Sequence, residues 1–235
     1  MCTVTFLPAN SGFVLTSNRD ESPARAALTS PPGVYKLLTG TAFFPKDAQG
    51  GTWFAAASTG QIHCLLNGAF KKHQHTPPYR KSRGIVLLES LQYNRPEIFA
   101  ESYNFDGIEP FTMIMVEPAE SLELFEFRWD GLSPALKSID PHLPHIWSSV
   151  TLYDEQAQKM RQKVFDDWLM SDAGSESIFD LHKHGGYGDP ENDFRMNRNG
   201  MVSTVSITQV TDTPQQSTMK YQDLLTGLTE ELQLY

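Results

Sequence analysis

The stretch MCTVTFLPANSGFVLTSNRDE (residues 1–21) contains two short apolar runs joined by turn-forming residues. Residues 2–7 and 13–17 are rich in β-branched and aromatic side chains, and the PANSG sequence between them is typical of a reverse turn. We therefore expect an antiparallel hairpin at the start of the chain. Pairing of its two strands would bring the charged sequence that follows the second strand back beside Cys2.

Further strands and fewer helices are expected along the rest of the chain. Short or alternating apolar runs predict strands at 52–58, 61–67, 111–117, 122–129, 203–210 and 217–222. Helical spacing predicts helices at about 80–92, 95–102, 154–170 and 175–185. Hairpins at both ends, helices between them and no linker or repeat predict a single α+β domain over residues 1–235.

The helix expected at 154–170 has the clearest amphipathic pattern. Asp154 is suited to cap its first turn. The residues expected on its buried face are Ala157, Met160, Val164 and Trp168, with Phe165 and Leu169 beside them.

Composition excludes several classes of function. The chain carries 19 Lys and Arg against 28 Asp and Glu, a formal net charge of −9, and shows no basic stripe suited to nucleic acid. The one basic stretch, residues 71–83, contains two prolines and is interpreted as a solvated loop. No apolar run reaches the roughly 18–20 residues that a membrane span needs, and no signal sequence is evident. Two cysteines cannot form a disulfide framework, so we expect a reducing, cytoplasmic location.

Cys2 can become the first residue of the mature chain. Methionine aminopeptidase removes Met1 when the second side chain is small, and the product carries a thiol and an α-amine on one residue. An α-amine with a pKa of about 7.7–8.0 can act as a general base near neutral pH. An N-terminal amine that activates its own side chain is an established nucleophile arrangement. The alternative is a small hydrophobic cysteine at the start of a strand.

Arg19 and Asp20 are the charged residues that the hairpin would bring near Cys2. The arginine would favour the thiolate, and the aspartate would hold the amine. The alternative is a charged surface loop whose internal ion pairs contribute little to stability.

The joint pattern of Cys2, the NRDE sequence at 18–21, Arg25, the GGTW sequence at 50–53 and Asn67 resembles the NRDE family, the transport-and-Golgi-organisation protein two type. The resemblance is close in the N-terminal third and extends loosely to the strand at 202–210. It implies a four-layer αββα sandwich of two mostly antiparallel sheets between helices, similar to N-terminal-nucleophile hydrolases of the penicillin V acylase and bile-salt hydrolase branch.

The resemblance also implies site residues and a reaction class. Cys2 would be the nucleophile, Arg19 and Asp20 its thiolate and amine partners, and Asn67 an oxyanion donor worth about 3–4 kcal/mol. The protein would act on the amide or acyl bond of a small molecule, and would need no metal or cofactor. The branch also has a later asparagine and arginine, for which Asn197, Arg198 and Asn199 are the nearest candidates.

A second function stays open beside the enzyme. Eukaryotic members of the resembled family are linked to Golgi organisation, lipid metabolism and haem handling, which implies a carrier or sensor of haem or acyl-CoA. Cys64 is interpreted as a buried thiol. The histidine pairs at 73 and 75, 142 and 145, and 182 and 184 suggest a metal site only weakly, because they fall in Pro- or Gly-rich sequence.

Overall fold

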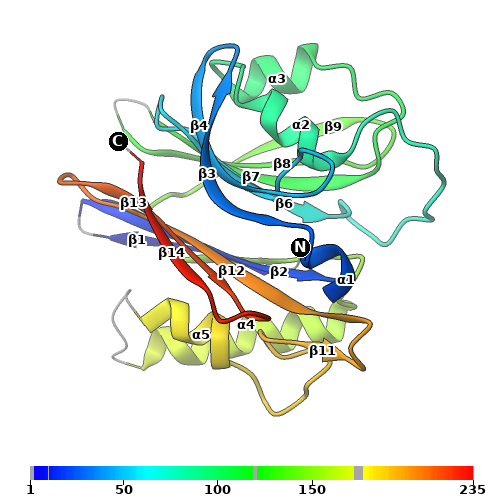
Figure 1. The fold of residues 1–235 in the computed structure, drawn as a ribbon, viewed down its shortest axis with the longest axis vertical. Helices are drawn as coiled ribbons and strands as arrows, with labels where there is room; N and C mark the ends of the chain where they lie inside the picture. The colour runs from blue at the N-terminus through cyan, green and yellow to red at the C-terminus, as the bar shows by residue number, and fades with distance from the viewer. Residues whose placement is uncertain (1–2, 10, 119–120, 172–176, 235) are drawn as a thin grey trace.

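The computed structural model describes residues 3–9, 11–118, 121–171 and 177–234, and shows two antiparallel sheets between two layers of helices (Figure 1). Strand order in the first sheet is β10-β1-β2-β12-β13-β14, with β11 also paired to β12. Its strands are β1 (Thr3–Ala9), β2 (Gly12–Glu21), β10 (His145–Ser148), β11 (Asn197–Arg198), β12 (Val202–Asp212), β13 (Ser217–Asp223) and β14 (Thr229–Gln233).

The second sheet runs in chain order, from β3 to β9. Its strands are β3 (Ser30–Leu37), β4 (Gly40–Lys46), β5 (Phe54–Ala57), β6 (Ile62–Asn67), β7 (Phe111–Glu117), β8 (Glu123–Trp129) and β9 (Pro134–Ile139). Helices α2 (Arg83–Ser90) and α3 (Pro96–Ser102) cover its outer face, and α4 (Glu155–Met170) and α5 (Ile178–His184) cover the outer face of the first sheet (Figure 1). The short helix α1 (Pro23–Ala26) follows β2. The expected αββα order is confirmed.

The predicted N-terminal hairpin is present, and its second strand is longer than expected. β1 and β2 pair antiparallel with Thr3 opposite Asn18 and Phe6 opposite Leu15. The NRDE sequence was expected in a loop after the strand, but it lies inside β2, which continues to Glu21 because β12 pairs with it as far as that residue. Neighbouring side chains of a strand point to opposite faces, so Arg19 and Asp20 face different layers.

The core between the two sheets is apolar. Val4 and Phe6 from the first sheet pack in one buried cluster with Phe54, Ile62 and Ile114 from the second. Alternation therefore places the even-numbered side chains of β1 between the sheets, and Thr3 and Thr5 toward the helices.

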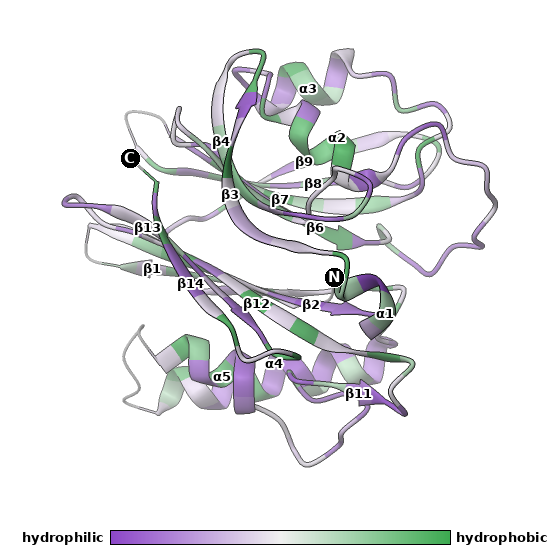
Figure 2. Cartoon of the chain, viewed as in Figure 1, coloured by the Kyte–Doolittle hydropathy of each residue, from purple (hydrophilic) through white to green (hydrophobic). Residues whose placement is uncertain are grey.

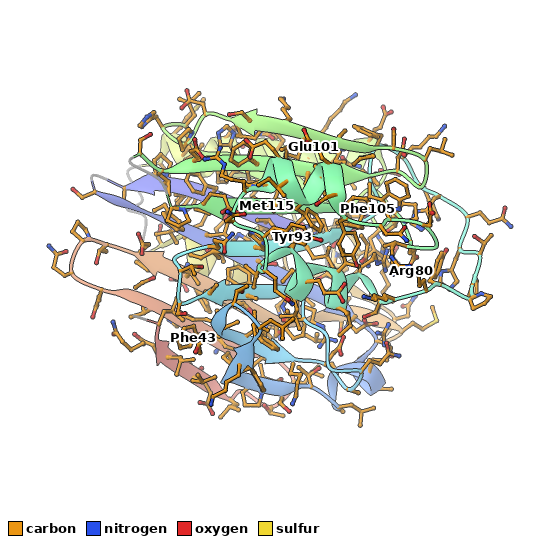
Figure 3. The ribbon with its side chains drawn as sticks, turned by 90° about the horizontal axis from the view of Figure 1, so that it is seen from above. Phe43, Arg80, Tyr93, Glu101, Phe105 and Met115 are labelled. Carbon is orange, nitrogen blue, oxygen red and sulfur yellow. The ribbon has the colours of Figure 1, made fainter. Side chains whose placement is uncertain are left out.

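The interface between the second sheet and α2 and α3 is largely apolar, with one buried polar group in which His63 lies 2.8 Å from Ser90 Oγ and 2.7 Å from the Glu117 carboxylate. Phe99 of α3 is fully buried, and its ring lies 5.3 Å from that of Phe105 and 5.2 Å from that of Phe127. Figure 3, which looks onto this layer, shows Phe105 and Tyr93 beside the two helices. In Figure 2 α2 is largely hydrophobic, whereas α4 on the opposite side carries mostly hydrophilic residues.

The buried face of α4 differs from the expected one. Its buried residues are Ala157, Arg161 and Phe165, whereas Met160 and Leu169 are 41% and 40% exposed. The helix is rotated relative to the apolar stripe because Arg161, at helical spacing from Ala157 and Phe165, finds acceptors beneath the first sheet. Asp154 caps the helix as predicted, accepting from the Ala157 backbone N–H at 2.8 Å.

Several strands carry little pattern in the sequence and were not predicted: β3, β4, β9, β10 and β14. β9 and β14 are edge strands whose residues are mostly exposed, so they lack the apolar alternation that marks a strand. None of the helices in the described part of the chain is both long and apolar enough to cross a membrane.

Candidate functional site

A cavity of about 590 Å³ lies where the C-terminal end of β2 meets the end of β6 and the loops around them. β2 contributes Arg19 and Glu21, β6 contributes Leu65 and Asn67, and Gly84 comes from the first turn of α2. The remaining residues of its wall are Arg25, Asp47, Gln49, Thr52, Trp53, His75, Tyr79, Lys81, Ser82, Arg83 and Glu109. Two of the predicted site residues, Arg19 and Asn67, therefore share one cavity.

Arg19 is a buried cation, 5% exposed, on the wall of this cavity. Its guanidinium lies 4.0 Å from the ring centre of Trp53 and donates to Thr29 Oγ1 at 2.7 Å. Burial lowers the pKa of Arg19, and the nearby Glu21 opposes that change. No carboxylate among the described residues forms an ion pair with it. A guanidinium keeps its proton at neutral pH, so Arg19 offers the cavity a fixed positive charge.

Trp53 adds an unused donor to the same wall. The residue is 2% exposed, and its Nε1–H has no acceptor within the described structure. A buried donor without an acceptor costs about 1–3 kcal/mol. Arg19 stacks on the Trp53 ring, so two buried donor groups lie next to each other at the cavity wall.

Asn67 is the last residue of β6, opposite Phe111 of β7. Its backbone carbonyl accepts from Ser149 Oγ at 2.9 Å. Within the described residues no hydrogen bond occupies its side-chain amide, which lies on the cavity wall. The amide is therefore available to donate to a ligand.

Asp20 lies on the opposite face of the first sheet, toward α4 and α5. Its carboxylate accepts from Tyr153 Oη at 2.5 Å and from Thr204 Oγ1 at 2.6 Å, and the residue is 4% exposed. The structure does not bring Asp20 into the cavity with Arg19 and Asn67. That Asp20 holds the α-amine of Cys2 stays a prediction.

Cys2, the predicted nucleophile, lies outside the described residues. The next residue, Thr3, pairs with Asn18, which directly precedes Arg19. The first described residue of the chain is thus held at the end of the sheet to which Arg19 belongs.

The outer part of the cavity is lined by ion pairs. Arg25 pairs with Glu21 at 3.1 Å, and Arg83 pairs with Glu109 at 3.2 Å. Nε2 of His73 and Nδ1 of His75 each lie 3.1 Å from the Glu109 carboxylate. Burial alone would raise the pKa of Glu109, but the Arg83 guanidinium and the imidazoles outweigh it and lower that pKa. These contacts hold the loop at 71–82 against the cavity.

Gly51 of the GGTW sequence and Gly84 of α2 allow a close backbone contact beside the cavity. The Thr52 backbone N–H donates to the carbonyl of Gly84 at 3.4 Å. A Cβ added to Gly84 would lie 2.7 Å from the Thr52 carbonyl oxygen, and one added to Gly51 would lie 3.1 Å from the Gly84 carbonyl carbon. A side chain at either glycine would therefore push the two backbone segments apart.

The remaining sequence candidates lie elsewhere. Cys64 is buried as expected, and burial raises the pKa of its thiol to about 12. Asn197 Oδ1 accepts from the Gly200 backbone N–H at 2.8 Å, and Asn199 has a φ of 54°, so both form the β11–β12 turn. Arg198 lines a second cavity of about 780 Å³, which includes Tyr153. Among the described residues no group of three or more His, Cys, Asp or Glu side chains is arranged to hold a metal ion.

Sequence reasoning missed the polar network beneath β1. Arg161 is 1% exposed, its guanidinium lies 3.7 Å from the ring centre of Tyr153, and it donates to Thr3 Oγ1. His182, also fully buried, lies 2.8 Å from both Thr5 Oγ1 and Asn18 Oδ1. The available signal was an arginine four residues from Ala157 and four from Phe165, on the face that helical spacing buries.

Several solved structures of N-terminal-nucleophile hydrolases share this fold. A conjugated bile acid hydrolase mutant from Clostridium perfringens matches with a TM-score of 0.63 at 9% identity, over 99% of this chain and 92% of that one. The Caenorhabditis elegans ortholog of N-acylethanolamine-hydrolyzing acid amidase matches with a TM-score of 0.58 at 10% identity, over 88% and 92%. Penicillin V acylase from Agrobacterium tumefaciens matches with a TM-score of 0.51 at 8% identity, over 99% and 86%. The fold is therefore that of N-terminal-nucleophile hydrolases.

The family model described as Transport and Golgi organisation 2 matches residues 1–216. The chain belongs to that family, for which NRDE is a synonym. No curated protein sequence matches the chain.

Proposed function

We propose that the protein is an N-terminal-nucleophile amidohydrolase or acyltransferase, with Cys2 as its nucleophile after removal of Met1. The observation that carries the proposal is the cavity that holds Arg19 and Asn67 together, at the end of the sheet where Thr3 begins β1. The fold neighbours include an N-acylethanolamine-hydrolyzing acid amidase ortholog and a penicillin V acylase, which supports the reaction class and leaves the substrate of this chain open.

The proposed reaction uses the groups of the cavity in sequence. The Cys2 α-amine takes the thiol proton, and the thiolate, favoured by the Arg19 charge, attacks the acyl carbon. Asn67 donates to the oxyanion that forms. The amine returns the proton to the leaving nitrogen as its bond to the acyl carbon breaks, leaving a thioester on Cys2. Water, or another acceptor in a transferase, then attacks the thioester and regenerates the thiol.

The Trp53 donor gives this proposal a further support. A buried Nε1–H without an acceptor is costly to folding, and a ligand oxygen that reached it from the cavity that Trp53 lines would remove that cost. We assign it to binding the acyl substrate.

Intact-mass analysis combined with acyl trapping tests the proposal. The purified protein is expected to lack Met1, and incubation with a panel of N-acyl amides and activated esters is expected to add one acyl mass to the N-terminal peptide. Cys2→Ala should abolish the adduct. Cys64→Ala, a change at a fully buried thiol, is the matched control and should retain it.

Retained Met1, or an adduct that survives Cys2→Ala, would refute the nucleophile. Ligand binding without turnover that persists in Cys2→Ala would favour the carrier of haem or acyl-CoA, which stays a prediction from the family resemblance.

A further inference from the structure

The polar network beneath β1 is built around an arginine that stability does not explain. Arg161 is the largest fully buried side chain of the described structure. Its guanidinium donates to the backbone carbonyl oxygens of Asn192 at 2.9 Å and Asp193 at 2.5 Å, and to Thr3 Oγ1. No carboxylate pairs with it among the described residues. A buried cation with neutral partners carries a large desolvation cost, and a well-packed hydrophobic residue often replaces such a charge without loss of stability.

The contacts of Arg161 lead to the start of β1 and to the neighbouring end of β2. One is direct, through Thr3, the residue that follows Cys2 in the sequence. The other runs through Tyr153, which stacks on the guanidinium at 3.7 Å and donates to the Asp20 carboxylate at 2.5 Å. Thr204 donates to the same carboxylate from β12. The network thus combines a cation and an anion on the helix side of the first sheet.

We propose that Arg161 is a positioning residue that sets the charge state of the Cys2 α-amine. This inference rests on the proposed function, because only a mature N-terminal Cys2 has such an amine. Thr3 Oγ1 accepts from the Arg161 guanidinium, and consecutive Cα atoms are about 3.8 Å apart, so the covalent bond between Cys2 and Thr3 limits the distance from the amine to the guanidinium to about 10 Å. A cation at that range disfavours the ammonium form and keeps the amine neutral, as a general base requires.

Asp20 acts in the opposite sense, since an anion favours the ammonium form. The other titratable groups around the start of β1 in the described structure are His182, Tyr153 and Arg198 on the helix side, with Arg19 and Cys64 between the sheets. Burial first, and then the Arg161 charge, lower the pKa of His182 to about 3, so the imidazole is neutral. Arg161 and Asp20 are then opposed charges beneath β1, and Arg198, whose guanidinium lies 5.5 Å from the Tyr153 ring, is a second and more distant cation on that side.

The pKa of the α-amine provides the test. Competitive trace acetylation across pH, followed by mass spectrometry of the N-terminal peptide after the thiol is blocked, measures it in the intact protein. Arg161→Met and Arg161→Gln remove the charge and should raise this pKa by about 0.5–1 unit, with the pH profile of Cys2 acylation moving by the same amount. Arg161→Lys should restore the wild-type value. Asp20→Asn should lower it.

Arg128→Met is the matched control. Arg128 belongs to the second sheet, pairs with Glu126 at 2.9 Å, and lies outside the network, so its removal should leave the pKa unchanged. If Arg161→Met does not fold, Arg161→Gln decides, because it keeps hydrogen-bonding groups while removing the charge.

The outcomes separate this inference from the proposed function. Retained Met1 overturns both. Suppose that Met1 is removed and Cys2-dependent acylation is observed, but the α-amine pKa is the same in the wild type, Arg161→Met and Arg161→Gln. That result overturns the role of Arg161 alone. A pKa that falls in those variants overturns it as well.

Discussion

The two helical layers of this molecule cover their sheets with different shares of apolar and polar contacts. α3 buries an aromatic cluster centred on Phe99 against the second sheet. α4 and α5 combine a smaller apolar cluster, which includes Phe165 and Leu181, with many buried polar groups of the first sheet, including Thr3, Asn18 and Asp20. Apolar contacts stabilise a fold at lower desolvation cost than buried polar groups. The polar groups beneath the first sheet therefore suggest a functional role at the N-terminal strand rather than a contribution to stability.

We expect the largest loss of stability from a substitution in the layer of α2 and α3, which we call the apolar layer; the layer of α4 and α5 is called the polar layer. Phe99→Ala leaves a cavity among Tyr93, Phe105 and Phe127, and should lower the free energy of unfolding by about 3–5 kcal/mol. Urea unfolding measures this change. A loss below about 1 kcal/mol would mean that this cluster is not a close-packed core.

The polar layer should make stability depend on pH. His182 has a folded pKa of about 3 against an ordinary 6.5, so below pH 6.5 the unfolded chain binds a proton that the folded chain excludes. The contribution of His182 to the free energy of unfolding is therefore fully present well above pH 6.5 and is lost progressively as the pH falls toward 3. The loss at pH 5 relative to pH 7 should be about 2 kcal/mol.

His182→Gln should remove that part of the pH dependence, and His142→Gln, at an exposed site, should leave it intact. Urea midpoints at pH 5 and pH 7 for the three proteins measure it. Equal pH dependence in the wild type and His182→Gln would contradict a neutral, excluded imidazole.

The smallest stability effect should come from the cavity. Trp53→Phe removes a donor that has no acceptor, so stability should change by less than about 1 kcal/mol, while KM for an N-acyl amide substrate rises roughly 3–10-fold. Trp147→Phe is the matched control, because its Nε1 donates to Glu126 at 2.8 Å and its loss should cost about 1–3 kcal/mol. Equal destabilisation by both changes would argue against a donor reserved for ligand.

The fold and part of the site were predictable from particular residues. Apolar alternation and turn residues located the N-terminal hairpin, and the NRDE and GGTW sequences identified the family and pointed to Arg19 and Asn67. The sequence did not predict which face of the sheet the Asp20 side chain occupies. That face depends on β2 extending through the NRDE motif, and β2 extends that far because it pairs with β12, which is distant in the sequence.

The polar network was hidden for a similar physical reason. An arginine in a helix is usually solvent-exposed, and its burial can be predicted only when its hydrogen-bond acceptors are known. The acceptors of Arg161 belong to Asn192, Asp193 and Thr3, which are far away in the sequence. The apolar stripe predicted Met160 on the buried face, whereas Met160 is 41% exposed and the buried position is taken by Arg161.

One measurement tests most directly whether the polar layer supports the N-terminus while the apolar layer supports only the fold. The rate at which a thiol-reactive reagent modifies Cys2 is compared in Phe99→Leu and Tyr153→Phe, with buried Cys64 as the internal control for unfolding. Phe99→Leu, destabilised by about 1 kcal/mol, should react at the wild-type rate. Tyr153→Phe, which frees the Asp20 carboxylate from its 2.5 Å hydrogen bond, should react several-fold differently. Rates that follow stability alone, or that are unchanged in both variants, would contradict the account.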